Sequence, residues 1–480
     1  MILNWLLAFL SSALLVVLYP RFNFVWLAPV ALTPLIIACA REDRWAWRFA
    51  LGYGCGFAYW WGLCSWIHDT LGKYGGVGDL GAWALFALMC LAKAIQTGVF
   101  AALAGRMLRS RLAVAAVAAL WVAIEWTHGP TGFGWLMLGN AASDMDVVLR
   151  LAPFTGVWGL SFVFALMAAA VAWLILRLPR PQLAWLLLLP GLYLLPDVPR
   201  AERGDASAVL VQPNISEDAI WSDDLLNMTE RQLTISSLGP VLADQGKTDF
   251  IVWPEMPAPF YDYDPQFTGM LSRLARTTHA AILTGVVARA ADNQPLNSAL
   301  LVGPGGNIVS RYDKVHLVPF GEYVPWPFGA ITKKVSSEAG DFEAGRNPVV
   351  SSIDGHRIGS FICYESVYPA WVREFVESGA EVLLNVSNDG WFGRSEARQQ
   401  HLRIVRMRAA ENHRWILRST NNGITAAIDP AGRVMRAADE YQEVSARFAF
   451  RYREDKTVYT RFGDWFVIVC AGVVLAASLW

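Results

Sequence analysis

The stretch RIGSFICYES, residues 357–366, contains an apolar run that ends at Cys363 and is followed by Tyr364, Glu365 and Ser366. A short run of this kind predicts a strand, and the amphipathic segment 368–378 that follows predicts a helix. A strand, a sharp turn and a helix would place the Cys363 side chain on the turn, as in a nucleophile elbow. We expect the N-terminus of this helix to lower the pKa of the thiol.

Other segments repeat the alternation of strand and helix on both sides of this stretch. Strands are predicted at residues 208–212, 250–253, 281–287, 298–302, 357–362, 381–386, 415–419 and 425–428, and helices at 223–238, 265–279, 368–378 and 398–413. Several of the strands are almost wholly apolar, which indicates that both of their faces are covered. The sequence therefore predicts a layered α/β domain, a sandwich with its helices outside.

The whole chain has the composition of a membrane protein. Of its 480 residues, 54% are hydrophobic and 17% are charged, and the mean hydropathy is +0.33. The apolar excess is concentrated in residues 1–197 and 463–480. A spanning helix needs ~20 mostly apolar residues. Eight transmembrane helices are predicted, at residues 2–18, 24–40, 49–66, 80–104, 112–127, 156–176, 182–195 and 462–480.

Arginines predict the orientation of these spans. They follow the second, fourth and sixth spans, at Arg41, Arg44, Arg48, Arg106, Arg109, Arg111, Arg177 and Arg180. Because positive charge favours the cytoplasmic side, both termini are expected in the cytoplasm. The predicted domains are spans one to seven in residues 1–197, an outer catalytic domain in 198–460, and the eighth span in 461–480. In a bacterium, the outer domain would lie in the periplasm, on the inner membrane.

Cys363 is the only cysteine in the polar part of the chain, since the other five lie in apolar stretches. It therefore lacks a disulfide partner in its own domain, which leaves two interpretations: a reactive thiol or a buried structural cysteine. A net charge of −1, without a basic stripe, gives no indication of nucleic-acid binding. No metal site and no cofactor are predicted, because the histidines lack metal-ligand spacing.

Two further segments could assist a thiol nucleophile. Glu255 ends the strand-forming run WPE, residues 253–255, and could act as a base, although the tripeptide alone favours an exposed loop glutamate. Lys314 lies among apolar residues at the end of a hairpin strand. If it is buried it needs an acidic partner, for which Glu255 and Glu322 are the candidates. A solvated surface lysine is the alternative.

The order of Glu255, Lys314 and Cys363 resembles the nitrilase, or carbon–nitrogen hydrolase, superfamily. With the predicted spans, the chain resembles the apolipoprotein N-acyltransferases within that superfamily. The stretches that carry the resemblance are TGFGWL (131–136), WPE (253–255), HLVPFGEYVP (316–325), CYES (363–366), SNDGWFG (387–393) and STNNG (419–423). The resemblance implies a nitrilase-like αββα sandwich attached to a helical membrane domain.

The resemblance also implies site residues. Glu255 would be the general base, Lys314 would stabilise the tetrahedral intermediate and Cys363 would be the nucleophile. Supporting roles fall to Glu322, Tyr364 and Glu365. Substrate contacts are expected at Trp221 and Asn297, and lipid contacts at the loop aromatics Trp326, Phe328 and Trp391, for which ordinary loop packing is the alternative.

The implied reaction is a two-step transfer of an acyl chain. The donor would be the sn-1 ester of a phospholipid such as phosphatidylethanolamine. The acceptor would be the α-amine of diacylglyceryl-cysteine at the N-terminus of an apolipoprotein, with a thioester on Cys363 in between. The main alternative is a membrane-tethered amidase or nitrilase that hydrolyses small amides. A transporter or lipid-binding scaffold with a decayed enzyme domain would have lost at least one of the three catalytic residues.

Overall fold

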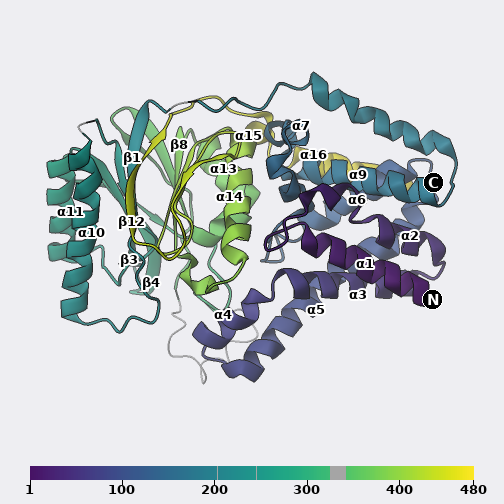
Figure 1. Ribbon diagram of the computed structural model, residues 1–480, viewed down its shortest axis with the longest axis horizontal. Coiled ribbons are helices and arrows are strands. Elements are labelled where there is room, and N and C mark those ends of the chain that lie inside the picture. Colours follow the sequence, from purple (N-terminus) through teal and green to yellow (C-terminus); the bar gives the residue numbers. More distant parts are fainter. Residues whose placement is uncertain (203, 245, 325–341, 480) are drawn as a thin grey trace. The chain divides into compact units, whose positions relative to one another are not determined.

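Figure 1 shows the computed structural model, which describes residues 1–202, 204–244, 246–324 and 342–479. The chain forms two compact units. Met1–Asp69, Asp79–Val198 and Thr457–Trp480 make up the first, called here the helical unit. Thr70–Gly78 and Pro199–Lys456 make up the second, called here the sheet unit.

Two six-stranded sheets form the centre of the sheet unit. The first sheet has the order β12-β1-β2-β3-β4-β5, with bounds Val444–Phe450, Ala206–Gln212, Phe250–Val252, Ala281–Arg289, Pro295–Val302 and Ile308–Asp313. The second has the order β11-β10-β9-β8-β7-β6, with bounds Val434–Ala437, Ala426–Ile428, Ile416–Thr420, Val382–Ser387, His356–Ile362 and Val350–Ile353. In each sheet the central strands are parallel and the outer strands are antiparallel.

Helices cover the outer face of each sheet. Helices α10 (Asp223–Ala243) and α11 (Pro265–Thr278) lie against the first sheet, and α13 (Pro369–Glu377) and α14 (Ala397–Asn412) lie on the side of the second (Figure 1). The two sheets face each other, since β1 contacts β9 and β4 contacts β7. The predicted αββα sandwich is therefore confirmed, as are the eight predicted strands and four predicted helices.

The core between the first sheet and its helices explains why those strands are so apolar. Val209, Ile251 and Trp253 are fully buried against Leu233 of α10 and Leu271 of α11. Burial of apolar surface stabilises such a layer by roughly 25 cal/mol per Å². A strand covered on both faces has no solvent-facing positions, so its sequence loses the alternation of polar and apolar residues.

The helical unit contains α-helices joined by short 3₁₀ segments. Its helices are α1 (Ile2–Val17), η1 (Val25–Val30), α2 (Thr33–Arg41), α3 (Trp45–Leu63), the start of α4 (Trp66–Tyr74), α5 (Gly78–Met107), α6 (Ala113–Trp126), η2 (Leu138–Asp144), α7 (Asp146–Leu149), α8 (Ala152–Thr155), α9 (Val157–Ile175), η3 (Arg180–Leu188), η4 (Pro190–Leu194), α15 (Val458–Phe462) and α16 (Trp465–Ser478).

Among the described residues, two helices are long and apolar enough to cross a membrane by length and composition: Gly78–Met107 and Val157–Ile175. Four further apolar helices are shorter, at Ile2–Val17, Val25–Arg41, Ala113–Trp126 and Trp465–Ser478. These six lie at positions where spans are predicted. The count of eight spans remains a prediction.

The seventh predicted span, residues 182–195, is not one continuous α-helix. It forms the 3₁₀ helices η3 and η4, and Pro190 stands at their junction. Proline lacks the N–H that an α-helix needs and collides with the preceding turn, which accounts for the break.

Two buried ionisable side chains contact residues 133–138, a segment that begins within the TGFGWL stretch. Lys93 of α5 donates from Nζ to the carbonyl of Phe133 at 2.9 Å. Glu125 of α6 accepts from the backbone N–H of Leu138, two residues beyond the stretch, at 2.6 Å. These side chains therefore satisfy two backbone groups of this segment.

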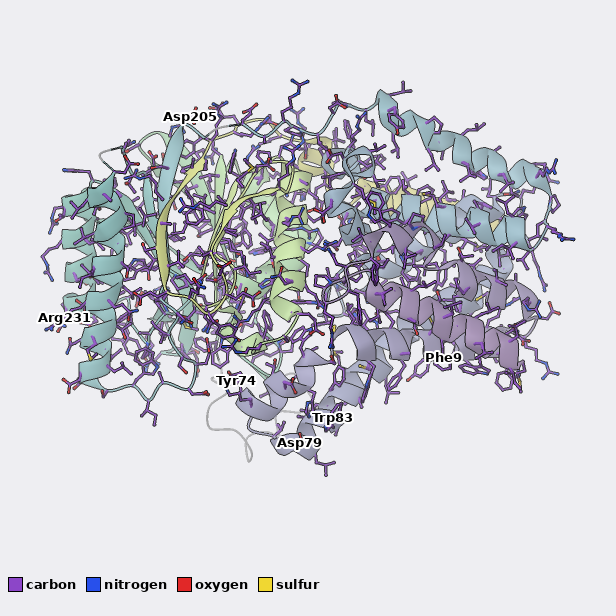
Figure 2. All side chains as sticks on the ribbon, viewed as in Figure 1. Phe9, Tyr74, Asp79, Trp83, Asp205 and Arg231 are labelled. Atoms are coloured by element: carbon purple, nitrogen blue, oxygen red, sulfur yellow. The ribbon has the colours of Figure 1, made fainter. Side chains whose placement is uncertain are left out.

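One short piece of the N-terminal region belongs to the sheet unit. In the segment Thr70–Gly78, which includes the end of α4, Lys73 pairs with Asp218 at 2.9 Å. Tyr74, labelled in Figure 2, packs edge-to-face on Trp391 with ring centroids 4.9 Å apart. The hydroxyl of Thr70 donates to the carbonyl of Trp391 at 3.0 Å. The sheet unit is thus assembled from two separate parts of the sequence.

Candidate active site

Glu255 lies just beyond the end of β2 and is 4% exposed. Its Oε1 accepts hydrogen bonds from Lys314 Nζ at 2.9 Å and from Asn297 Nδ2 at 2.8 Å. Its Oε2 accepts from the backbone N–H of Asn388 at 2.9 Å. The backbone around Glu255 packs closely on Gly285 of β3, where a side chain would not fit, because a Cβ there would lie 2.2 Å from the Met256 nitrogen.

Lys314 follows β5 and is 1% exposed. Its ammonium pairs with both candidate partners, Glu255 Oε1 and Glu322 Oε2, each at 2.9 Å. Burial opposes the charge, but the two carboxylates outweigh burial and raise the pKa of Lys314 above its ordinary value. The lysine is therefore a fixed cation in a nearly dry site, where its electrostatic effect is stronger than in water.

Asn297 of β4 completes this cluster. Its Nδ2 donates to Glu322 Oε1 at 2.6 Å as well as to Glu255 Oε1. An amide NH₂ group has two hydrogens, so both are used on the two carboxylates. Asn297 was expected among the substrate-contacting residues, and the structure places it 1% exposed with its NH₂ group bonded to both glutamates.

Cys363 stands where β7 ends and the short 3₁₀ helix η5 (Cys363–Val367) begins, as predicted. Its φ is +47°, a conformation that a non-glycine residue adopts only when its surroundings enforce it. The thiol is buried, with the residue 5% exposed. Burial raises the pKa of the Cys363 thiol, Glu255 raises it further and Lys314 opposes them.

The expectation that a helix N-terminus lowers the thiol pKa is therefore wrong. The helix that starts at Pro369 is separated from Cys363 by η5, and the effect of a helix terminus falls off within about one turn. Loss of hydration dominates instead. The thiol is neutral at neutral pH, so nucleophilic attack would need a base to accept its proton.

Glu365 joins the nucleophile turn to the lysine segment. Its carboxylate is fully buried. Oε2 accepts from the Ile362 N–H at 2.7 Å, one residue before Cys363. Oε1 accepts from the Val315 N–H at 2.8 Å, one residue after Lys314, and from the Tyr312 hydroxyl at 2.5 Å. One carboxylate therefore fixes the two chain segments that carry Cys363 and Lys314.

The remaining predicted site residues differ in how far they are buried. Tyr364 is 5% exposed and packs edge-to-face on Tyr368 with centroids 5.6 Å apart. Trp221 is half-buried and packs against the hydrophobic core under α10. Trp391 is 41% exposed. Trp326 and Phe328 lie outside the described residues.

A second buried cluster adjoins Cys363 and was not predicted. It consists of Asp389, His401 and Arg418, all fully buried. Arg418 donates to Asp389 at 2.6 Å. Burial opposes ionisation of the carboxyl, but Arg418 and His401 hold the pKa of Asp389 well below its ordinary value. An arginine inside the apolar strand ILRST was the available signal, because a buried guanidinium requires a partner.

Comparison with known proteins identifies the family of the sheet unit. The sandwich, with its buried carboxylate, lysine and cysteine, falls in the carbon–nitrogen hydrolase class, whose family model matches residues 208–447. A solved amidase from Nesterenkonia sp. is 16% identical with a TM-score of 0.40, covering 55% of this chain and 97% of that chain.

The helical unit has its own match. The family model described as the apolipoprotein N-acyltransferase N-terminal domain matches residues 11–170. The apolipoprotein N-acyltransferase of Geobacter metallireducens is 33% identical over 99% of this chain and 95% of its own length. That of Azotobacter vinelandii is 34% identical over 99% of this chain and 94% of its own length. The chain belongs to the apolipoprotein N-acyltransferase family.

Proposed function

We propose that this protein transfers the sn-1 acyl chain of a phospholipid, through a thioester on Cys363, to the N-terminal α-amine of a diacylglyceryl-cysteine apolipoprotein. The observation that carries the proposal is the buried cluster in which Lys314 bridges Glu255 and Glu322 beside the Cys363 turn. Family membership over nearly the whole chain favours lipoprotein N-acylation over hydrolysis of small amides.

In the first step, the Cys363 sulfur attacks the ester carbonyl while Glu255 accepts the thiol proton. The C–S bond forms, the C–O bond to the glycerol breaks, and the lysophospholipid leaves with the proton from Glu255. Because the thiol is neutral at rest, proton transfer accompanies attack. Lys314 and backbone N–H groups stabilise the oxyanion, and they are already oriented before substrate arrives.

In the second step, the α-amine of the apolipoprotein attacks the thioester carbonyl. Glu255 accepts a proton from the amine and returns it to the departing Cys363 sulfur. The amide bond forms and the free thiol is regenerated. A thioester reacts readily with amines, so the energy of the original ester is conserved, and a ping-pong scheme follows.

Both substrates carry acyl chains, which gives the helical unit its purpose. Moving a chain through water costs ~0.8 kcal/mol per exposed methylene, so donor and acceptor are best met at the bilayer. We place the protein in the bacterial inner membrane with eight spans, a periplasmic sheet unit and cytoplasmic termini. Tyr74 covers part of Trp391, and the 41% of Trp391 that stays exposed supports a lipid-facing role for its loop.

The acyl intermediate can be tested by mass spectrometry after incubation with phosphatidylethanolamine vesicles. We expect a hydroxylamine-labile acyl adduct on the Cys363 peptide that is absent in Cys363→Ala. Unmodified Cys363 in folded protein would remove the phospholipid donor. Turnover of simple amides by that same protein would then favour the amidase alternative.

Orientation can be tested by labelling with a membrane-impermeant maleimide. The six native cysteines are buried, so an introduced exposed cysteine should dominate the signal. Asp439→Cys, in the sheet unit, should react in intact spheroplasts, and Asp43→Cys, in the arginine-rich loop, should react only after lysis. Reaction of both variants, or the reverse pattern, would contradict the topology.

A further inference from the structure

His401 lies under the nucleophile turn and is not used in the chemistry described above. It is fully buried on α14. Its Nε2 is 3.2 Å from the carbonyl oxygen of Cys363 and 2.8 Å from the Ser366 hydroxyl. Its Nδ1 is 3.1 Å from an Arg418 nitrogen and 3.0 Å from Asp389 Oδ1.

The contact with Cys363 shows that Nε2 carries a hydrogen, because a carbonyl oxygen only accepts hydrogen bonds. On the other side of the ring, Nδ1 lies near Asp389 Oδ1, which only accepts, and near an Arg418 nitrogen, which only donates. A hydrogen on Nε2 is compatible with either protonation state of Nδ1. Burial and then Arg418 lower the pKa of His401, and Asp389 opposes them.

Asp389 holds Arg418 beside the His401 ring and also contacts the ring itself. Its two oxygens accept from the same Arg418 nitrogen at 2.8 and 2.6 Å, and Oδ1 also accepts from the Ser387 hydroxyl at 2.9 Å. Asp389 and Arg418 therefore both hold the His401 ring from its Nδ1 side, while Nε2 faces the Cys363 carbonyl.

The Cys363 carbonyl matters because it belongs to a planar trans peptide. In such a unit the C=O and the following N–H point in opposite directions. A hydrogen bond from His401 to the Cys363 oxygen therefore sets the direction of the Tyr364 N–H, away from His401. Because Cys363 has a positive φ, this peptide orientation needs support from its surroundings.

We propose that His401 is a positioning residue that fixes the Cys363–Tyr364 peptide plane, so that the Tyr364 N–H is aimed at the oxyanion formed when Cys363 is acylated. Arg418 and Asp389 hold the His401 ring in the required position. The inference rests on the proposed role of Cys363 as an acyl-accepting nucleophile. His401 thereby contributes to stabilising the oxyanion although it does not contact the substrate.

Two reagents separate this role from a general structural one. Acylation of Cys363 by a p-nitrophenyl ester passes through a tetrahedral oxyanion, whereas alkylation by iodoacetamide displaces iodide and forms none. Losing one oxyanion donor typically slows catalysis by about 10²–10³-fold. For His401→Leu in the full-length protein we expect acylation to fall by about 10–100-fold, with alkylation of the same thiol nearly unchanged.

Matched variants control for folding. Gln places an amide N–H near the position of Nε2, and Asn cannot reach that far, so His401→Gln should recover most of the acylation rate and His401→Asn should not. Ser366→Ala removes the other Nε2 contact and should leave both rates near wild type. Adducts are quantified on the Cys363 peptide, and thermal unfolding is recorded for each variant.

The outcomes are distinct. A selective loss of acylation in His401→Leu, recovered by Gln, supports the proposal. Equal losses of acylation and alkylation, equal rates for the Gln and Asn variants, or no loss at all would each overturn it. A wild-type protein that is alkylated but never acylated would instead refute the proposed function, and the inference would fall with it.

Discussion

Replacing Glu365 by Gln exchanges one buried carboxylate oxygen for an NH₂ group and leaves the shape of the side chain almost unchanged. The carboxylate accepts from three backbone N–H groups and one hydroxyl, those of Ile362, Val315, His316 and Tyr312. All four partners are donors. The single oxygen of a glutamine amide can accept hydrogen bonds only where one of the two carboxylate oxygens stood. Its NH₂ group then takes the place of the other oxygen and faces a donor.

The cheaper orientation keeps the amide oxygen toward Tyr312, Val315 and His316 and turns the NH₂ group toward the Ile362 N–H. One hydrogen bond to a charged group is then lost, at ~1.5–3 kcal/mol. The buried Ile362 N–H is left unsatisfied, and the other bonds become neutral and weaker. We expect Glu365→Gln to lower the free energy of unfolding by about 3–5 kcal/mol.

Function should suffer more than stability alone predicts, because Ile362 precedes Cys363 and Val315 follows Lys314. A misplacement of about 1 Å can cost about 10²-fold in rate, so acylation of Cys363 should fall by about that factor in protein that is still folded. The assay combines chemical unfolding with the rate of acyl-adduct formation. Glu377→Gln makes the same chemical change in a side chain that is 47% exposed and paired with Arg373, and it should cost less than about 1 kcal/mol. A Glu365→Gln protein with the stability and rate of that control would refute the reasoning.

Three further predictions concern other parts of the sheet unit. In Gly390→Ala the new Cβ would lie 1.5 Å from Glu217 Oε1, so the melting temperature should drop, and the drop should be much smaller when Glu217→Ala is already present. Burial lowers the pKa of His316 to about 4, so the unfolded chain binds the proton first as pH falls. Thermal stability should therefore decrease from about pH 6.5 to about pH 4, and a His316→Phe protein with the same pH dependence would contradict this. Lys314→Met leaves two carboxylates buried without their cation and should destabilise the fold by about 3–5 kcal/mol, measured by chemical unfolding; a loss below about 1 kcal/mol would show that the cluster is hydrated.

The central strands were predictable because burial on both faces leaves a continuous apolar run, as in VLVQ of β1 and VLLN of β8. The edge strands β6, β11 and β12 were not assigned. They are half-exposed, so their sequences lack that run. In addition, β12 pairs with β1 in the register Ala206↔Phe450, across most of the domain, and no local pattern encodes a partner that distant.

The candidate site also combines features that local sequence predicts with features that depend on contacts between distant segments. The strand-to-turn position of Cys363 follows from local sequence, and its resemblance to a known superfamily supplied Glu255 and Lys314 as candidates. The contacts of Asn297 could not be inferred, because they depend on β4 lying between two glutamates from other segments. The thiol pKa was predicted with the wrong sign, since a sequence shows the nearby helix but not the extent of burial.

The segment Thr70–Gly78 has a consequence for dividing the protein into parts. Expression of residues 199–456 alone, as a soluble catalytic fragment, would omit the tyrosine that packs on Trp391 and the lysine that pairs with Asp218. Such a fragment would present a bare indole where the intact chain has an aromatic contact, and bare aromatic surface promotes aggregation. A fragment faithful to the native sheet unit therefore has to be a two-piece design, with residues 70–78 supplied as a peptide or grafted through a new linker.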